Sequence, residues 1–209
     1  MANIAIIRLI YGMTLCPAQL AGELLAAGHT PLVIFFKRMD ALDINADDSA
    51  YARGDVPLIS YIVNSKGAQT VRMGQWRTTT ANELKHLVTR LKEFEPDAIG
   101  ISCLSEAMTL AGEVTEHLRQ YFDVPILWGG TGPTLEAERS IAHADLVCVG
   151  EGEDVIREIG ARLDAKQSLA DIDGTWFKLP DQSIQKTQSA QYPTLKPLPY
   201  QHGNPSITR

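Results

Sequence analysis

"AIGISCLSEAMTLAGEVTEHLRQYFDVPILWGG" (Ala98–Gly130) decides the fold of this 209-residue chain. It opens with the apolar run "AIGIS" and closes with a second apolar run, "VPILW" (Val124–Trp128). Between the two runs, small and apolar residues recur at helical spacing: Ala107, Ala111, Val114 and Leu118. A strand, a helix and a second strand in this order favour a parallel sheet that is covered by helices on both faces.

The same alternation extends along the chain in both directions. Further strands are predicted at Asn3–Ile10, Pro31–Phe36 and Leu146–Val149. Further helices are predicted from Pro17 to Gly28, after the capping box at Thr80–Glu83, from Thr134 to Ile141, and from Glu153 to Ala165. The pattern therefore predicts an α/β fold: a flavodoxin-like (Rossmann-like), doubly wound parallel sheet of five strands in the order 2-1-3-4-5.

Two segments interrupt this rhythm. Residues 37–79 begin polar and acidic and continue as a predicted hairpin that turns at Ser65–Gly67. From residue 170 onward, "GTWFKLPDQSIQKT" is typical of a small hairpin, and "YPTLKPLPYQHGNPSITR" is proline-rich and extended. We therefore predict an α/β domain over residues 1–169, with residues 37–79 as an insert, and a hairpin with a linker over residues 170–209.

Charge and composition exclude several classes of protein. The formal net charge is −6 and no Lys/Arg-rich run is present, so a nucleic-acid surface is not expected. The longest apolar stretches have the length of strands, and the first residues lack the pattern of a signal peptide, so neither a membrane span nor secretion is expected. Cys16, Cys103 and Cys148 lie far apart, which favours reduced thiols in a cytoplasmic protein.

Four loops follow predicted strand ends: "YGMTLCP", "SCLS", "WGGTGPT" and "GEGE". All are small, polar or rich in glycine, and they meet at the edge of the sheet where open α/β folds bind ligands. Any one of them is also explained by the ordinary needs of turns and helix caps. Four on the same edge favour a binding floor for a large, flat ligand.

The residues at this edge also limit the kind of ligand. The loop after the first strand offers only Gly12, so the dinucleotide fingerprint is absent, and no P-loop is present. The later helices begin with acidic residues: Glu106, Glu136, Glu138, Glu153 and Asp154. These carboxylates would occupy the place of a bound anion. The expected ligand is therefore neutral at these contacts and rich in amides or hydroxyls.

Four motifs in order carry a resemblance to a known family: "GISCLS", "VPILWGGTGPTLEAE", "ADLVCVGEGE" and "DIDGTWFK". The chain resembles the N-terminal cobalamin-binding domain of cobalamin-dependent radical SAM enzymes of the class B methyltransferase kind. The resemblance covers nearly the whole chain and is strongest between Asp97 and Lys178. It implies that Ser102 with Leu104, and Gly129 with Gly130, hold the nucleotide tail of cobalamin while the corrin ring lies over the strand ends.

The resemblance further implies that Gly150, Glu151 and Gly152 line the adjoining part of the pocket, where Glu151 accepts hydrogen bonds from a ribose hydroxyl or a corrin amide. The implied cofactor-binding positions are Tyr11, Gly12, Met13, Thr14, Leu15, Cys16, Ser102, Cys103, Leu104, Ser105, Trp128, Gly129, Gly130, Thr131, Gly150, Glu151 and Gly152. Two roles stay open at this point. Trp128 packs either on the cofactor or in the core, and the buried Arg8 is satisfied either by an acid such as Asp97 or by the ligand.

The chain departs from the family in the loop after the first strand. Many cobalamin domains carry Asp-x-His-x-x-Gly there, with the histidine bound to cobalt, whereas this loop, "YGMTLCPAQLAG", has neither Asp nor His. His29, His86, His117, His143 and His202 all fall at places that do not substitute for it. We therefore expect cobalamin with its tail detached (base-off) and no protein histidine on cobalt. Cys16 as a thiolate ligand is disfavoured because an unactivated thiol stays protonated.

A second departure concerns catalysis. The three cysteines do not form the Cys-x-x-x-Cys-x-x-Cys motif of a radical SAM cluster, so this chain alone is not expected to catalyse a reaction. The resemblance implies a parent methyltransferase whose C-terminal radical SAM barrel holds a [4Fe-4S] cluster and S-adenosylmethionine. Two alternatives remain open: a stand-alone corrinoid carrier or sensor, and a domain that only mediates assembly.

Overall fold

The computed structural model describes residues 1–9, 16–36, 56–64, 67–76 and 79–188, and between 56 and 76 it describes the backbone alone. The strands are β1 (Asn3–Leu9), β2 (Thr30–Phe36), β3 (Val56–Asn64), β4 (Gly67–Trp76), β5 (Ala98–Ser102), β6 (Ile126–Gly129), β7 (Leu146–Cys148), β8 (Thr175–Lys178) and β9 (Ile184–Lys186). The helices are α1 (Cys16–Ala26), α3 (Ala81–Phe94), α4 (Met108–Leu118), α5 (Thr131–Leu135), α6 (Ala137–Ile141) and α7 (Glu153–Asp164), with a 3-10 turn at Ser105–Ala107 before α4.

The main sheet has the strand order β2-β1-β5-β6-β7-β8-β9. Its parallel part, β2 to β7, confirms the predicted order 2-1-3-4-5. The five predicted parallel strands are all present, and the predicted C-terminal hairpin extends the same sheet with the antiparallel strands β8 and β9. Pairing with β8 satisfies backbone groups along β7 that an edge strand would leave open. The predicted boundary between residues 169 and 170 stays a prediction.

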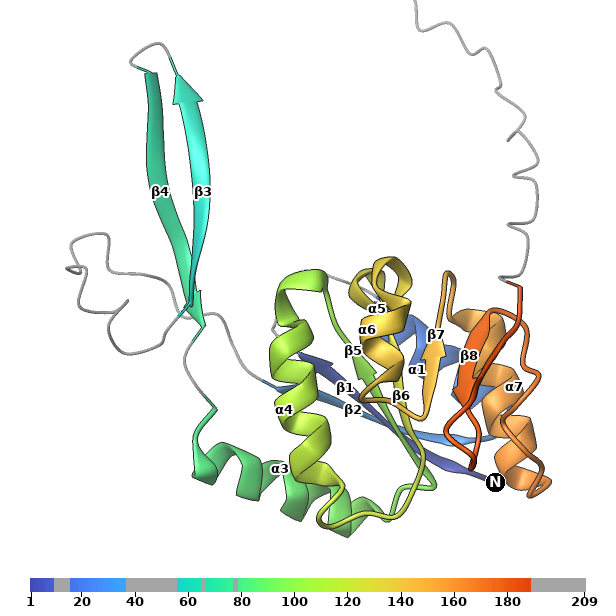
Figure 1. Ribbon diagram of the computed structural model, residues 1–209. Coiled ribbons are helices and arrows are strands. Elements are labelled where there is room, and N and C mark those ends of the chain that lie inside the picture. The colour runs from blue at the N-terminus through green and yellow to red at the C-terminus, as the bar shows by residue number, and fades with distance from the viewer. Residues whose placement is uncertain (10–15, 37–55, 65–66, 77–78, 189–209) are drawn as a thin grey trace, which may run out of the picture.

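Helices cover both faces of the sheet, as Figure 1 shows. On β1, Ala5 and Ile7 face a core formed with α3 and α4, whereas Ile4 and Ile6 face a second core formed with α1 and α7. This division follows from the two-residue alternation of side chains along a strand. Because both faces are buried, the strands read as nearly continuous apolar runs in the sequence.

The insert contains the predicted hairpin. Strands β3 and β4 form a separate antiparallel two-stranded sheet in which Asn64 is opposite Gly67. In Figure 1 this hairpin projects away from the main sheet. The capping box is also confirmed: Thr80 Oγ1 accepts a hydrogen bond from the Glu83 amide, and the Glu83 carboxylate accepts one from the Thr80 amide. No helix in the described part of the chain is long and apolar enough to cross a membrane.

The predicted helix between Thr134 and Ile141 is instead two short helices, α5 and α6. Glu136 separates them, with φ −127° and ψ 51°, which is not a helical conformation. Helix α5 begins at Thr131, directly after Gly130, earlier than predicted. The chain therefore turns into a helix immediately at the end of β6, and this turn shapes the site described next.

Candidate functional site

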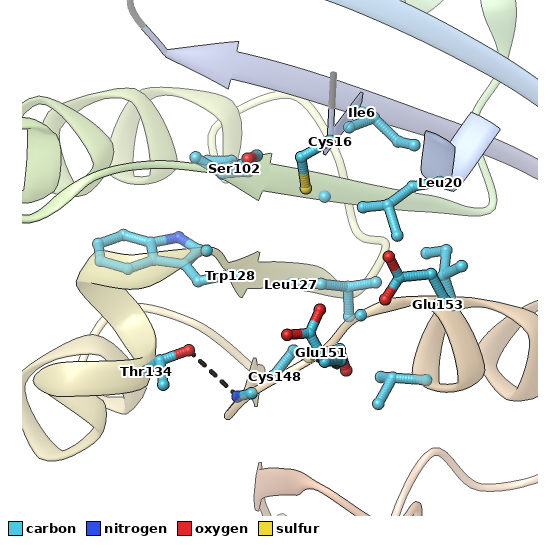
Figure 2. A pocket seen from close by; sticks show the side chains of 18 of the residues that line it. Ile6, Cys16, Leu20, Ser102, Leu127, Trp128, Thr134, Cys148, Glu151 and Glu153 are labelled. Carbon is cyan, nitrogen blue, oxygen red and sulfur yellow. Dashed lines mark hydrogen bonds between the residues drawn. The ribbon is translucent and has the colours of Figure 1, made fainter. Parts of the chain in front are cut away.

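A cavity of about 370 Å³ opens at the C-terminal ends of β5, β6 and β7, between the sheet and the helices α1 and α7. Its volume lies within the range of about 300–1,000 Å³ that is usual for small-molecule sites. Figure 2 shows side chains from the sheet and from both helices around it, among them Ile6, Cys16, Ser102 and Glu151. The site is therefore at the predicted edge of the sheet, but it is a deep cavity and not a shallow floor.

The structure brings nine of the predicted positions together around this cavity: Cys16, Ser102, Trp128, Gly129, Gly130, Thr131, Gly150, Glu151 and Gly152. Three others, Cys103, Leu104 and Ser105, do not line it. Tyr11, Gly12, Met13, Thr14 and Leu15 lie outside the described residues. Their contact with a cofactor stays a prediction.

At Gly130 the loop after β6 packs closely against the loop after β5. Gly130 has φ +105°, and a Cβ on it would lie 2.6 Å from the carbonyl oxygen of Cys103. The amide of Cys103 in turn donates to the carbonyl oxygen of Gly129 at 3.0 Å. Only glycine fits this close approach of two backbones. Gly130 is therefore required by the geometry of the mouth, whatever occupies the cavity.

A hydrogen bond between Gly150 and Thr134 joins the loop after β7, at the opening of the cavity, to α5. The amide of Gly150, which also has a positive φ of 105°, donates to Thr134 Oγ1 at 3.1 Å, drawn as a dashed line in Figure 2. Thr134 itself lines the cavity. The loop after β7 is therefore held against the first turns after β6, so that the two glycine-rich loops form one rim.

The sequence reasoning missed the depth of the cavity. Its apolar interior comes from three strands and two helices: Ile6, Leu127, Leu146, Leu20, Val155, Ile156 and Ile159. Gly100 in β5 also lines it, and the nearest atom to a Cβ placed there would be the Ala5 carbonyl oxygen at 3.6 Å. A glycine within a buried strand is a known sign of a closely approaching ligand, and "AIGIS" carried that signal. The remaining lining residues not predicted are Ile101, Leu135, Cys148, Glu153 and Thr134.

The cysteines at the cavity are thiols. Burial raises the pKa of Cys16, with a further increase from the nearby Glu153 carboxylate, and burial raises the pKa of Cys148 to about 12. A protonated thiol is a poor metal ligand because the thiolate is the form that coordinates. That Cys16 does not act as a thiolate ligand stays a prediction.

The sequence allows Trp128 to pack either on the cofactor or in the core. Its backbone position borders the cavity, but the indole nitrogen donates to Thr115 Oγ1 at 3.0 Å and the ring stacks on His143 at 5.5 Å between centroids. The side chain is 1% exposed and belongs to the core on the α4 side. The indole therefore packs in the core. None of the histidines in the described ranges lines the cavity.

Arg8 is 3% exposed at the end of β1. One terminal nitrogen, Nη1, donates to Ser102 Oγ at 3.1 Å, and the buried Nε has no hydrogen-bond partner among the described residues. Asp97 does not satisfy it, because the Asp97 carboxylate accepts a hydrogen bond from the Asn3 amide at the opposite end of the strands. Of the two alternatives for Arg8, the acid named in the sequence analysis is therefore wrong.

Comparison with known proteins agrees with this geometry. The B12 binding domain family matches residues 61–160. No curated protein matches the sequence. The fold is similar to that of OxsB, a cobalamin-dependent S-adenosylmethionine radical enzyme solved with aqua-cobalamin and S-adenosylmethionine bound, with a TM-score of 0.61 and 14% identity over 91% of this chain.

The fold is also similar to that of TsrM from Kitasatospora setae, a radical S-adenosylmethionine methyltransferase solved with cobalamin and a [4Fe-4S] cluster bound, with a TM-score of 0.56 and 14% identity over 91% of this chain. This chain spans 22% of the OxsB chain and 30% of the TsrM chain. Residues 61–160 therefore resemble a B12 binding domain, and the fold of the chain is similar to that of part of OxsB and of TsrM.

Proposed function

We propose that this domain binds cobalamin base-off, with the nucleotide tail in the cavity, and presents it to a separate radical SAM barrel for a methyl transfer reaction. The observation that carries the proposal is the deep apolar cavity beneath the C-terminal ends of β5, β6 and β7. It lies where open α/β sheets bind their ligands and is open toward the glycine-rich rim. Bound methylcobalamin would supply the methyl group.

The residues around the cavity fit the parts of this cofactor. The space next to Gly100 is free of side chains, and the walls of the interior are apolar, which suits the flat aromatic base at the end of the tail. The mouth is polar. The Glu151 carboxylate and the Thr131 hydroxyl at the rim are suited to hydrogen bonds with hydroxyls and amides. The base of cobalamin is apolar and the rest of its nucleotide tail is polar, which matches a cavity with an apolar interior and a polar opening.

Base-off binding without a protein histidine is supported by the residues available at the mouth. The loop between β1 and α1 contains no histidine in its sequence, and the described histidines lie away from the cavity. Cys16 borders the cavity with a raised pKa. We infer that the domain orients and shields the cofactor and leaves the lower face of cobalt without a side-chain ligand from Cys16 or from these histidines.

The catalytic partner is part of the proposal. OxsB and TsrM are several times longer than this chain, and S-adenosylmethionine is bound in the OxsB structure and a [4Fe-4S] cluster in the TsrM structure. We infer that a barrel domain C-terminal to the proline-rich segment holds these groups. The boundary between residues 169 and 170 and a cytoplasmic location remain part of this proposal.

The test is an absorption titration of the purified chain with hydroxocobalamin and methylcobalamin, followed by desalting. The wild-type chain is expected to retain corrinoid with the spectrum of the tail-detached form. In Gly100→Leu the new side chain would point into the cavity from a position where a Cβ makes only ordinary contact, so retention should fall at least about tenfold while the melting temperature is kept.

The matched control is Gly22→Leu on α1, because Gly22 is exposed and a Cβ there meets nothing within 4 Å. This variant should retain corrinoid like the wild type. If the folded wild-type chain retains none, cobalamin binding by this domain is refuted. If Gly100→Leu retains as much as the wild type, the tail does not occupy this cavity.

A further inference from the structure

Arg8 is buried next to Ser102, a residue that lines the cavity, and no carboxylate among the described residues pairs with its guanidinium. Arg8 is 3% exposed, its Nε is buried without a hydrogen-bond partner, and its contact to Ser102 is its single described hydrogen bond. Burying a charge that is neither paired nor fully hydrogen-bonded is unfavourable, and proteins rarely retain such a group without a role. The structure around Arg8 shows what the missing partner would be.

The chain itself offers no partner among the residues that the structure describes. Arg8 is opposite Ser102 in the β1–β5 register, and Asp97 lies five residues before Ser102, about 16 Å away along the strand. The charges of Glu151 and Glu153 act on the Cys16 thiol together with Arg8, but neither carboxylate forms an ion pair with it in the described structure. The same holds for Glu106, which acts with Arg8 on Cys103. The segment that follows β1, "IYGMTL", contains no acidic residue.

The guanidinium is on the cavity side of the sheet. Arg8 shares its face of β1 with Ile6, which lines the cavity, and the hydroxyl that it contacts belongs to Ser102, which lines it as well. Ser102 Oγ accepts from Arg8, so its own O–H remains available to donate to another group. Two donors, one of them charged, therefore lie together at the C-terminal ends of β1 and β5, where Ser102 lines the cavity (Figure 2).

We propose that Arg8 and Ser102 bind the phosphodiester of the nucleotide tail of cobalamin, an inference that rests on the proposed function. This group links the base to the corrin side chain and would lie between the apolar interior and the rim. A phosphodiester carries a single negative charge, which one guanidinium matches.

The test uses three corrinoids: cobalamin, cobinamide phosphate, which has a phosphate but no base, and cobinamide, which has neither. Dissociation constants are measured by absorption titration for the full chain and for Arg8→Met. The substitution should weaken binding of cobalamin and of cobinamide phosphate about 10- to 100-fold and leave binding of cobinamide unchanged. Arg8→Lys, which keeps the charge but not the fork of donors, should lose less than Arg8→Met.

Stability supplies the second readout. The melting temperature of ligand-free Arg8→Met should equal or exceed that of the wild type, because an unpaired buried charge is replaced by an apolar side chain of similar length. Arg90→Met on the exposed face of α3 is the control and should change neither affinity nor stability.

The outcomes separate the two proposals. Failure of the wild-type chain to bind cobalamin would refute the proposed function itself. Equal cobalamin affinity for the wild type and Arg8→Met would overturn only the phosphodiester site. An equal loss for all three corrinoids, or a lower melting temperature of the ligand-free variant, would also overturn it and assign Arg8 a structural role.

Discussion

At Gly130 a Cβ would collide with the main chain, whereas at Gly100 it would make only an ordinary contact with the Ala5 carbonyl oxygen. The first glycine combines a positive φ with an approach of 2.6 Å to a carbonyl oxygen, so its replacement would disturb the rim with or without a ligand. The second lacks both constraints, and its nearest neighbour is at an ordinary contact distance. For this reason a substitution at Gly100 tests cofactor binding without disturbing the fold, whereas a substitution at Gly130 would disturb both.

The two buried thiols make a prediction at the residue scale. Burial raises the pKa of Cys103 and of Cys148 to about 12 from an ordinary value of 9.0. Between these values the unfolded chain has lost the thiol protons and the folded chain has kept them, so the free energy of unfolding falls as pH rises from about 9 toward 12. Each thiol contributes up to about 1.4 kcal/mol per pH unit in this window.

Urea unfolding at a series of alkaline pH values checks this, with the double variant Cys103→Ala/Cys148→Ala as the comparison. The variant should lose stability less steeply above pH 9 than the wild type, although it begins from a lower value because two buried side chains are truncated. Parallel curves for the two proteins would contradict the raised pKa values.

At the scale of elements, the capping box at Thr80 and Glu83 fixes where α3 begins. Thr80 and Glu83 satisfy two amides at its first turn. Thr80→Ala should lower the free energy of unfolding by about 1 kcal/mol, since one of these amides would lose its partner.

Urea denaturation measures the cost of this change, and Thr89→Ala on the same helix is the control. Thr89 is exposed and its hydroxyl bonds only to the Lys85 carbonyl oxygen, which the helix already uses. Its removal should leave stability unchanged or slightly raised. A Thr80→Ala variant as stable as the control would show that α3 is held by its packed face alone.

At the scale of the whole molecule, the C-terminal hairpin completes the main sheet. Strand β8 pairs with β7, and the Val149 amide donates to the Gly174 carbonyl oxygen at 2.8 Å. Ile172 and Leu169 are buried in the core beneath the cavity. A chain that ends after residue 169 should therefore unfold at a much lower temperature, or fail to fold, because β7 would become an edge strand over an exposed core.

Thermal unfolding followed by circular dichroism tests this, and a chain that ends at Gln188 is the control, because it keeps the described contacts of β8 and β9. The control should melt close to the full chain. If the chain ending after residue 169 melts there as well, the folded unit ends where the sequence placed the boundary.

The sequence by itself determined the parallel strands and their order, the hairpin of the insert, the cap of α3 and the edge of the sheet that carries the site. These features follow from local patterns: apolar runs of strand length, helical spacing, and turn or cap residues at fixed offsets. The glycine within "AIGIS" is a further local feature of the sequence that indicates a closely approaching ligand.

Only the tertiary structure decided which residues meet across elements. Alternation along a strand shows that Trp128 and Leu127 face opposite sides, but not that the first packs against α4 and the second lines the cavity. In the same way, a charged residue in a buried strand does not reveal its partner, and Arg8 meets Ser102 only through the β1–β5 register. The depth of the cavity likewise depends on how α1 and α7 pack over the sheet, and such long-range packing has no local signature in the chain.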